Sequence, residues 1–267
     1  MAQYTLGVLG FGKMAQAILR GAIAGGQVAA QAVVAYDPDE KQQALARGMG
    51  IACAASAAGA GACPRVLLAV KPQMVAPVLA EIAPAVGAQT TVVSIAAGIT
   101  AGAIDKALAG KGRIVRVMPN TPMQVGAGAS AIAAGPRADQ GDIEWTRELF
   151  AAGGLAVAVE ERLLDAVTGL SGSGPAYFFY FVEALAAAGV AEGLPADIAA
   201  QLAVQTCVGA GQLLAQSGKS PQELRVQVTT PGGTTQRALE TMDAAGVKAS
   251  LAQAVRAAVL RSRELGK

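Results

Sequence analysis

The sequence predicts an α/β amino-terminal part followed by an all-helical carboxyl-terminal part. Short apolar runs of strand type alternate with helical spacing over residues 4–159. A glycine turn, Gly10-Phe11-Gly12, connects the first of these runs to the first helix. After residue 160 the strand-like runs disappear. We therefore expect two domains, covering residues 1–160 and residues 161–267.

An apolar strand at residues 4–9, the glycine turn and a helix at residues 14–23 predict a dinucleotide-binding unit. Gly10 permits a tight turn, Gly12 lets a pyrophosphate approach bare backbone, and Ala15 lets the helix pack closely on the strand. The phosphates then lie at the helix N-terminus, where free N–H groups and the macrodipole favour anions. A glycine triplet alone is weak evidence, because it also serves as a packing turn.

Asp37 supplies the supporting context. A second strand, at residues 32–36, ends at Asp37, about 22 residues after Ala15, where a Rossmann unit places the group that binds the adenosine ribose. A carboxylate there accepts a hydrogen bond from a ribose 2′-OH and repels a 2′-phosphate, which favours NADH. In the alternative interpretation, Asp37 only caps the helix expected at residues 40–47. We expect the first domain to be a Rossmann dinucleotide-binding domain.

The later loops extend the expected site. Ligands of open α/β sheets bind beyond the carboxyl ends of strands, so the loops that follow the strands at residues 65–70, 91–94 and 113–118 should line the cofactor. Lys71 could face a phosphate, the nicotinamide or solvent. Asn120 lies in a loop that two prolines should make rigid and non-helical, and it could bridge cofactor and substrate or form a plain turn.

The other elements expected in this domain are strands at residues 129–134 and 155–159, helices at residues 73–83, 101–109 and 139–150, and a loop or short helix at residues 56–62. The cofactor-binding residues predicted from these motifs are Leu9, Gly10, Phe11, Gly12, Lys13, Met14, Asp37, Ala69, Val70, Lys71, Pro72, Ala96, Ala97 and Asn120.

Composition narrows the chemistry. The 267-residue chain has no histidine, which excludes mechanisms built on a histidine base. Its three cysteines have no metal-ligand spacing, so we expect reduced thiols and no metal site. The net charge of +2 gives no reason to expect nucleic-acid binding. Glu183 and Glu192 interrupt the longest apolar stretch, and residues 1–5 show no targeting segment, so we expect a cytoplasmic protein without a membrane partner.

The second domain should be helical throughout, with helices at residues 163–169, 175–192, 196–216, 221–226, 232–244 and 247–265. Their faces are broad and lined with alanine, and several helices are apolar nearly all round. This pattern predicts burial against another copy of the chain.

Two polar glycine segments lie in this helical half. Residues 171–176 open a long helix, with Ser173 placed to cap it and Pro175 near its first turn, and this structural role is a sufficient explanation. Residues 229–235 combine four threonine hydroxyls with a Gly-Gly pair at a helix start, an arrangement that can hold a small carboxylate. A capped turn between helices would need only one hydroxyl. We therefore expect a substrate anion site there.

Taken together, these segments resemble the pyrroline-5-carboxylate reductase family. The matching segments span nearly the whole chain in order and are Gly10-Phe11-Gly12-Lys13-Met14-Ala15, Ala69-Val70-Lys71-Pro72, Ala96-Ala97-Gly98, Met118-Pro119-Asn120-Thr121-Pro122, Gly169-Leu170-Ser171-Gly172-Ser173-Gly174-Pro175-Ala176-Tyr177 and Pro231-Gly232-Gly233-Thr234-Thr235. The resemblance implies an all-helical dimerisation domain after the Rossmann domain, and a homodimer or a ring of dimers. Each active site would combine one subunit's cofactor domain with the threonine turn of the other.

The resemblance also implies a reaction. Hydride passes from C4 of NADPH or NADH to the ring C=N carbon of 1-pyrroline-5-carboxylate and gives L-proline. A protonated imine is already a strong hydride acceptor, so a chain without histidine needs mainly to position two molecules. Thr235 is the expected catalytic hydroxyl beside the imine nitrogen, and the expected substrate-binding residues are Thr230, Gly233, Thr234 and Thr235.

The chain departs from the family pattern at two places. The family often uses NADPH and sometimes NADH, whereas the carboxylate of Asp37 favours NADH, the less common cofactor. Thr234 occupies a position where relatives frequently carry alanine, and it adds one hydroxyl to the expected substrate site.

Two other functions are compatible with parts of the sequence. A β-hydroxyacid dehydrogenase has a similar two-domain plan, but it would be expected to use a lysine on an early helix of the second domain. After residue 160 the only lysines are Lys219, Lys248 and Lys267, none of them on the long helix after Pro175. A nucleotide-sensing regulatory protein would retain the fold without turnover, and an assay with NAD(P)H and pyrroline-5-carboxylate separates it from an enzyme.

Overall fold

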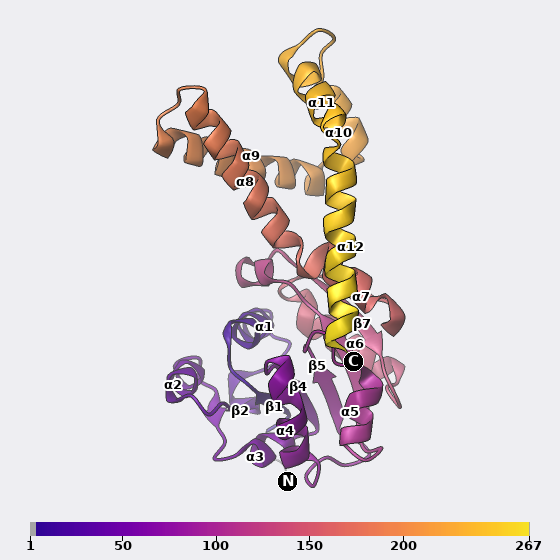
Figure 1. Ribbon diagram of the computed structural model, residues 1–267. Helices are drawn as coiled ribbons and strands as arrows, with labels where there is room; N and C mark the ends of the chain where they lie inside the picture. Colours follow the sequence, from indigo (N-terminus) through magenta and orange to yellow (C-terminus); the bar gives the residue numbers. More distant parts are fainter. Residues whose placement is uncertain (1–3, 267) are drawn as a thin grey trace. The chain divides into compact units, whose positions relative to one another are not determined.

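The computed structural model describes residues 4–266 (Figure 1). Contacts divide the chain into two compact units. The sheet unit extends to Ser173 and takes in the chain again from Ala258, and the helical unit is Gly174–Ala257. Residues 161–173, which the sequence analysis assigns to the second domain, pack with the sheet unit.

Within the described residues, the sheet unit contains an eight-stranded sheet with the order β3-β2-β1-β4-β5-β6-β7-β8. Its strands are β1 (Leu6–Leu9), β2 (Val33–Tyr36), β3 (Ala52–Cys53), β4 (Arg65–Leu68), β5 (Thr91–Ser94), β6 (Arg113–Met118), β7 (Gly128–Ala134) and β8 (Gly154–Ala158). Neighbouring strands are parallel, except that β6 and β7 are antiparallel. The first six strands therefore form the expected Rossmann arrangement, with their carboxyl ends at one edge.

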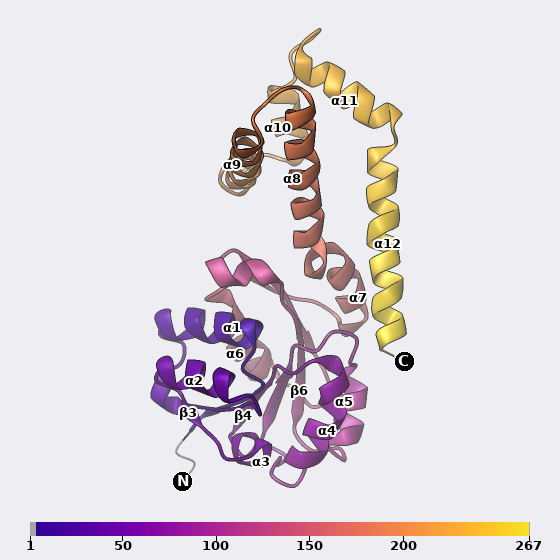
Figure 2. The same ribbon diagram turned by 60° about the vertical axis from the view of Figure 1, so that its left-hand side comes forward.

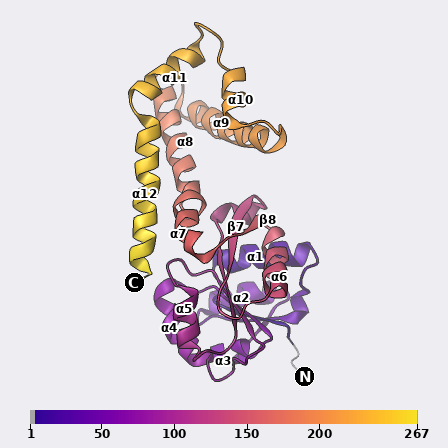
Figure 3. The ribbon, with the colours of Figure 1, turned by 90° about the vertical axis from the view of Figure 1, so that its right-hand side faces the viewer.

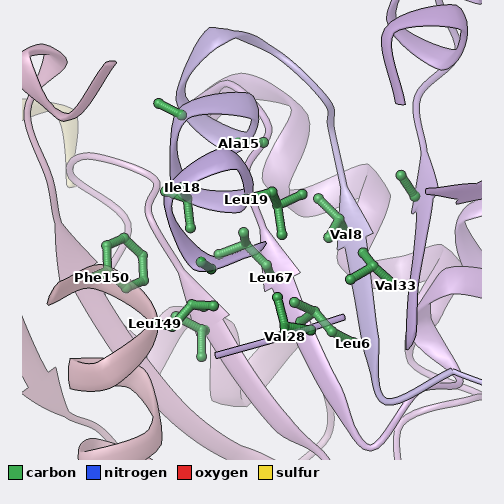
Figure 4. Close-up of a cluster of buried hydrophobic side chains, with 14 of the residues drawn as sticks. Leu6, Val8, Ala15, Ile18, Leu19, Val28, Val33, Leu67, Leu149 and Phe150 are labelled. Atoms are coloured by element: carbon green, nitrogen blue, oxygen red, sulfur yellow. The ribbon is translucent and has the colours of Figure 1, made fainter. Parts of the chain in front are cut away.

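Helices cover both faces of the sheet. On one face lie α1 (Lys13–Ala24), α2 (Glu40–Gly48) and α6 (Gln140–Ala151), and on the other lie α3 (Ala57–Gly61), α4 (Pro72–Ile82) and α5 (Ala101–Ala107) (Figure 2). Residues 56–62, expected as a loop or short helix, form α3, which Ser56 caps by accepting the Gly59 N–H. Strand side chains alternate between the two faces. Leu6 and Val8 therefore meet α1 and α6, with Ile18, Leu19 and Phe150 in the same core (Figure 4).

A short helical run follows β8. Where the sequence analysis expects one helix over residues 163–169, the chain forms a 3₁₀ turn (Glu161–Leu163), one α-helical turn α7 (Leu164–Val167) and a π-helical turn (Thr168–Gly172). The Glu161 carboxylate accepts hydrogen bonds from Arg116 Nη1 at 2.9 Å and from the Ala101 N–H at 2.7 Å. These bonds attach the run to β6 and to the first turn of α5.

The end of α12 (Val247–Leu265) returns to the sheet unit. Ser262 is buried, and its hydroxyl donates to Asp165 Oδ1 at 2.7 Å. Leu265 lies against Gly98, in the loop after β5, where an added Cβ would be 3.1 Å from the Leu265 Cβ. The last turns of the chain therefore support a loop at the carboxyl edge of the sheet.

The helical unit contains α8 (Gly174–Ala191), α9 (Ala196–Gln216), α10 (Pro221–Gln227), α11 (Thr234–Ala244) and the first part of α12. Helices α8 and α9 pack together (Figure 3) through small residues, since a Cβ on Gly189 would be 3.3 Å from the Ala199 Cβ. Their outer faces stay uncovered: Phe179 is 62% exposed, Tyr180 71% and Leu202 54%. By length and composition, α9 and the run Glu161–Ala191 that contains α8 could cross a membrane.

Candidate active site

A cavity of about 420 Å³ lies at the carboxyl edge of the sheet. It is formed where β1, β4, β5 and β6 end, the position at which open α/β sheets bind ligands. The residues that line it are Gly12, Lys13, Met14, Ala69, Val70, Lys71, Pro72, Ile95, Ala96, Ala97, Met118, Pro119, Asn120, Thr121 and Gly172. Ten of the predicted cofactor-binding residues are in this set, and they come together from four separate loops.

Gly10 and Gly12 have different roles in the glycine turn. Gly10 has a φ of +87°, and a Cβ there would lie 2.8 Å from the Ala69 carbonyl oxygen, so the fold itself requires glycine. Gly12 has extended backbone, and a Cβ on it would meet no described atom within 4 Å. The space beside Gly12 is thus left for a ligand, as expected where a pyrophosphate approaches the backbone.

The N-terminus of α1 is suited to an anion. Gly12 is the N-cap and has no side chain that could cap the helix, and no acidic residue lies in the first turn. The N–H groups of this turn therefore keep their hydrogen-bonding capacity, and the helix dipole favours negative charge. Lys13 lies at the first helical position and lines the cavity, which adds a positive charge.

Asp37 is bonded to the glycine turn. Its Oδ2 accepts the Phe11 N–H at 2.7 Å and its Oδ1 accepts the Asp39 N–H at 3.0 Å. Asp39, rather than Asp37, caps α2 by accepting the Lys41 N–H. The alternative interpretation of Asp37 as that helix cap is therefore wrong. Each carboxylate oxygen retains a second lone pair, so hydrogen bonding of Asp37 to a ribose stays a prediction.

Three other predicted residues support the cavity without lining it. Leu9 and Phe11 are almost fully buried in the core, and the Gly10 N–H donates to the Tyr36 carbonyl at 2.8 Å. The cavity also contains five residues that were not predicted to bind the cofactor: Ile95, Met118, Pro119, Thr121 and Gly172. The strand-end rule could have found the first four. Gly172 comes from a distant segment and could not be found that way.

The loop after β6 differs from the expectation. Residues Thr121–Val125 form a 3₁₀ helix, so the loop expected to be non-helical is partly helical. Its second residue, Pro122, fits there because proline is tolerated in the first turn of a helix, where its missing N–H would have no partner. Asn120 is only 9% exposed, and both ends of its amide are bonded to protein, to the Ser171 carbonyl and the Ala129 N–H.

The threonine turn lies in the helical unit, before α11. Gly233 is the N-cap of α11 and carries no capping side chain. The Gly232 N–H donates to Gln236 Oε1 at 2.7 Å, and the Thr229 hydroxyl donates to the Arg225 carbonyl at 2.6 Å. Among the described residues, the hydroxyls of Thr230, Thr234 and Thr235 have no hydrogen-bond partner. Three unpaired hydroxyls and an uncapped helix N-terminus thus occupy one turn, an arrangement that can bind an anion.

Comparisons with known proteins agree with this arrangement. Residues 161–265 match the family model for pyrroline-5-carboxylate reductase dimerisation, and residues 5–98 match a model described as NADP oxidoreductase coenzyme F420-dependent. Pyrroline-5-carboxylate reductase 3 of Rattus norvegicus is 39% identical over 98% of this chain and 96% of its own length. Pyrroline-5-carboxylate reductase of Pisum sativum is 40% identical over the same shares.

Two solved structures are similar over nearly all of the chain. One is a pyrroline-5-carboxylate reductase from Coxiella burnetii, with a TM-score of 0.92, 33% identity and 99% of both chains covered. The other is the Plasmodium falciparum pyrroline carboxylate reductase with NADP bound, with a TM-score of 0.87, 28% identity and 100% of both chains covered. Each of these two structures therefore resembles both the amino-terminal part and the helical part of this chain.

Proposed function

The chain belongs to the pyrroline-5-carboxylate reductase family, and on this premise we propose how its residues reduce 1-pyrroline-5-carboxylate to L-proline with NADH or NADPH. The observation that carries the proposal is the cavity at the carboxyl edge of the sheet, with the open side of Gly12 and the uncapped start of α1. This is an NAD(P) site in a chain without histidine, and imine reduction is a reaction that needs none.

The residues divide the work between two regions. Lys13, Met14 and the backbone of Gly12 hold the pyrophosphate, and the small side chains of Ala96 and Ala97 let the loop after β5 pack against the flat nicotinamide ring. When bound, the reduced nicotinamide supplies hydride to the ring C=N carbon. Positioning of the two reactants can supply roughly 7–11 kcal/mol of the barrier.

The threonine turn holds the substrate. Thr230, Thr234 and the Gly233 backbone bind the carboxylate, and the Thr235 hydroxyl donates a hydrogen bond at the imine nitrogen as that nitrogen becomes an amine. The unpaired hydroxyls support this assignment, since an anion supplies the acceptors that the chain does not.

The active form is a homodimer, either alone or as the unit of a ring of dimers. The exposed apolar faces of α8 and α9 support this, because they belong to the segment that matches the dimerisation model. Each site combines the cavity of one copy with the threonine turn of its partner. Because a second copy covers these faces, α8 and α9 remain outside membranes. The enzyme works in the cytoplasm. Its partner is a small-molecule substrate, and it does not bind nucleic acid.

NADH is the preferred cofactor. Asp37, Asp39 and Glu40 place three carboxylates at the end of β2, where the adenosine ribose lies in this fold. A 2′-phosphate there meets negative charge, with Lys41 as the nearest cation in sequence.

The test is a turnover assay with both cofactors. Purified protein is mixed with pyrroline-5-carboxylate and either NADH or NADPH, and the absorbance of the reduced nicotinamide is followed while proline is quantified. We expect equal amounts of cofactor consumed and proline formed, with a higher kcat/KM for NADH. Tight cofactor binding without turnover would instead support the regulatory protein. A higher kcat/KM for NADPH would reject the role given to Asp37.

A further inference from the structure

The segment that the sequence analysis explains as a helix cap lies beside the cofactor cavity. Gly172 lines the cavity, and it ends the π-helical turn Thr168–Gly172. Single π turns are rare and occur frequently at functional sites. None of the roles assigned above uses this turn.

The Ser171 carbonyl of this turn cannot be bonded by the N–H four residues on. The Ser173 N–H donates to the Thr168 carbonyl at 2.8 Å, five residues back, which is the π-helical pattern. In a regular helix, the Ser171 carbonyl would accept the N–H of residue 175. Residue 175 is proline and has no N–H. The sequence therefore removes the helical partner of Ser171 at the point where the turn meets the cavity.

Asn120 supplies the missing partner. Its Nδ2 donates to the Ser171 carbonyl oxygen at 3.0 Å, and its Oδ1 accepts the Ala129 N–H at 2.8 Å. Asn120 is buried and is the only asparagine in the chain. A short amide carries a donor and an acceptor on two separate atoms of one rigid plane, so one Asn120 side chain connects β7 to the π turn, whereas an ionised carboxylate has no donor.

A second contact fixes the same wall. Met118, at the end of β6, has its terminal methyl group in the space that a Cβ on Gly172 would occupy. Met118 also packs against the small core cluster that contains Leu164, in the helical run that precedes the π turn. The Met118 side chain thus contacts the backbone at Gly172, and the Asn120 amide bonds the carbonyl of the preceding residue, Ser171.

We propose that Asn120 is a positioning residue for hydride transfer, which fixes the π-helical turn and with it the cavity wall at Gly172. The inference rests on the proposed function and assigns Asn120 a role other than cofactor contact. The loops after β5 and β6 are on the far side of β1 from Asp37, so this wall borders the nicotinamide half of the cofactor. A displacement of about 1 Å at a reacting centre can reduce the rate about a hundredfold.

The test is a double-mutant cycle between Asn120 and Pro175. Asn120→Ala removes both bonds of the amide, and Asn120→Asp keeps the acceptor for Ala129 while removing the donor to Ser171. Pro175→Ala restores an N–H that can bond the Ser171 carbonyl within the helix. Thr91→Val is the matched control, because it removes a buried side-chain hydrogen bond, 2.6 Å from the Thr91 hydroxyl to Asp142 Oδ1, at the opposite end of β5. For each variant, kcat, the KM of both substrates, the NADH dissociation constant and the Tm are measured.

We expect Asn120→Ala and Asn120→Asp each to lower kcat about tenfold to a hundredfold, with a dissociation constant for NADH within about threefold of the unchanged protein. Pro175→Ala should restore a large part of the lost kcat in the Asn120 variants, so that the two effects are not additive. Thr91→Val should lower the Tm and leave the kinetic constants unchanged.

Two results would overturn the proposal. If Asn120→Ala lowers the Tm as Thr91→Val does and leaves kcat unchanged, the amide is only structural. If Asn120→Ala raises the NADH dissociation constant by the same factor as it lowers kcat/KM, and Pro175→Ala restores nothing, Asn120 contacts the cofactor directly. Absence of turnover in the unchanged protein would contradict the proposed function. That outcome can be told apart from both results above, because each of them requires an active unchanged protein.

Discussion

The two units of the chain differ in how completely each buries its own apolar residues. The sheet unit encloses two core layers, with side chains such as Phe11, Phe150 and Leu67 fully buried. The helical unit leaves large side chains exposed on α8 and α9, including Phe178 and Phe179. The sheet unit can therefore assemble its cavity from one chain, whereas the helical unit needs a second copy to cover its apolar surface. Cofactor binding and turnover should respond differently when each unit is altered.

The largest effect should come from a charge on the uncovered helical face. Leu202→Glu places a carboxylate on a 54% exposed leucine of α9, and burying that charge between two copies would be strongly unfavourable. We expect the dimer to dissociate and turnover to be lost, while NADH still binds to the sheet unit. Size-exclusion chromatography with light scattering and an NADH titration measure the two effects. Lys111→Glu, on an exposed loop of the sheet unit, is the charge control and should leave both unchanged.

The next effect concerns the hydroxyl expected to act on the substrate. Thr235→Ala should lower kcat by about 10²- to 10⁴-fold, the usual contribution of a proton donor, without abolishing turnover, because positioning of the reactants remains. NADH affinity should be unchanged, since the variant leaves the sheet unit intact. The control is Thr241→Ala, whose hydroxyl donates to the Arg237 carbonyl farther along the same helix. A Thr235→Ala enzyme with unchanged kcat and KM would remove Thr235 from the site.

The two glycines of the turn should separate folding from cofactor binding. Gly12→Ala should leave the Tm within a few degrees and weaken NADH binding about tenfold or more, because its Cβ enters open space where the pyrophosphate is expected. Gly10→Ala should instead lower stability, since positive φ costs a non-glycine residue about 1–3 kcal/mol and the Cβ also meets the Ala69 carbonyl. Thermal unfolding measures the stability of both variants, and NADH titration measures their cofactor affinity. Equal loss of stability in the two would contradict this division.

The smallest effect concerns the stability of the fold at low pH. A hydrogen bond from the Asp142 N–H holds the pKa of Asp139 below its ordinary value at the start of α6, and hydrogen bonds from Ser220 do the same for the pKa of Glu223 at the start of α10. A carboxylate whose pKa is lowered by folding stabilises the fold above its unfolded pKa, about 3.9 for Asp and 4.3 for Glu, and loses that contribution as pH falls through the folded value.

Both carboxylates are at the surface, so each contribution should be modest. We expect Asp139→Asn and Glu223→Gln to lower the Tm slightly at neutral pH and to have less effect as the pH falls from about 5 to about 2. The measurement is the Tm of each variant and of the unchanged protein across that range. An equal difference in Tm at every pH would show that the charge of these side chains does not contribute.

Much of the sheet unit could be predicted from the sequence because strands and their ends are local patterns. The strands at residues 91–94 and 113–118 were predicted with the bounds that the structure has. The Rossmann fold, the NAD(P) cofactor and the family resemblance are confirmed. Strand β3 was missed, because two residues are too few to show an alternation.

The helical unit was predicted equally well at the level of elements. Helix α9 and helix α12 have the expected bounds, and the strong alanine pattern is the reason. Its broad apolar faces also indicated that a second copy covers them, but the residues at which two copies meet depend on the shapes of both surfaces, which no local pattern encodes. The placement of Thr235 relative to the cofactor stays a prediction for the same reason.

The sequence by itself determined the class of the fold, the glycine turn and most of the cavity, because those depend on period, on backbone freedom and on the ends of neighbouring parallel strands. Only the tertiary structure decided the partners of side chains that lie far apart in sequence. It placed Asp37 on the Phe11 N–H, gave the cap of α2 to Asp39, and brought Asn120 to the Ser171 carbonyl. Hydrogen bonds between distant segments follow from how those segments pack, and the periodic pattern of apolar residues shows which face is buried but not which distant side chains meet.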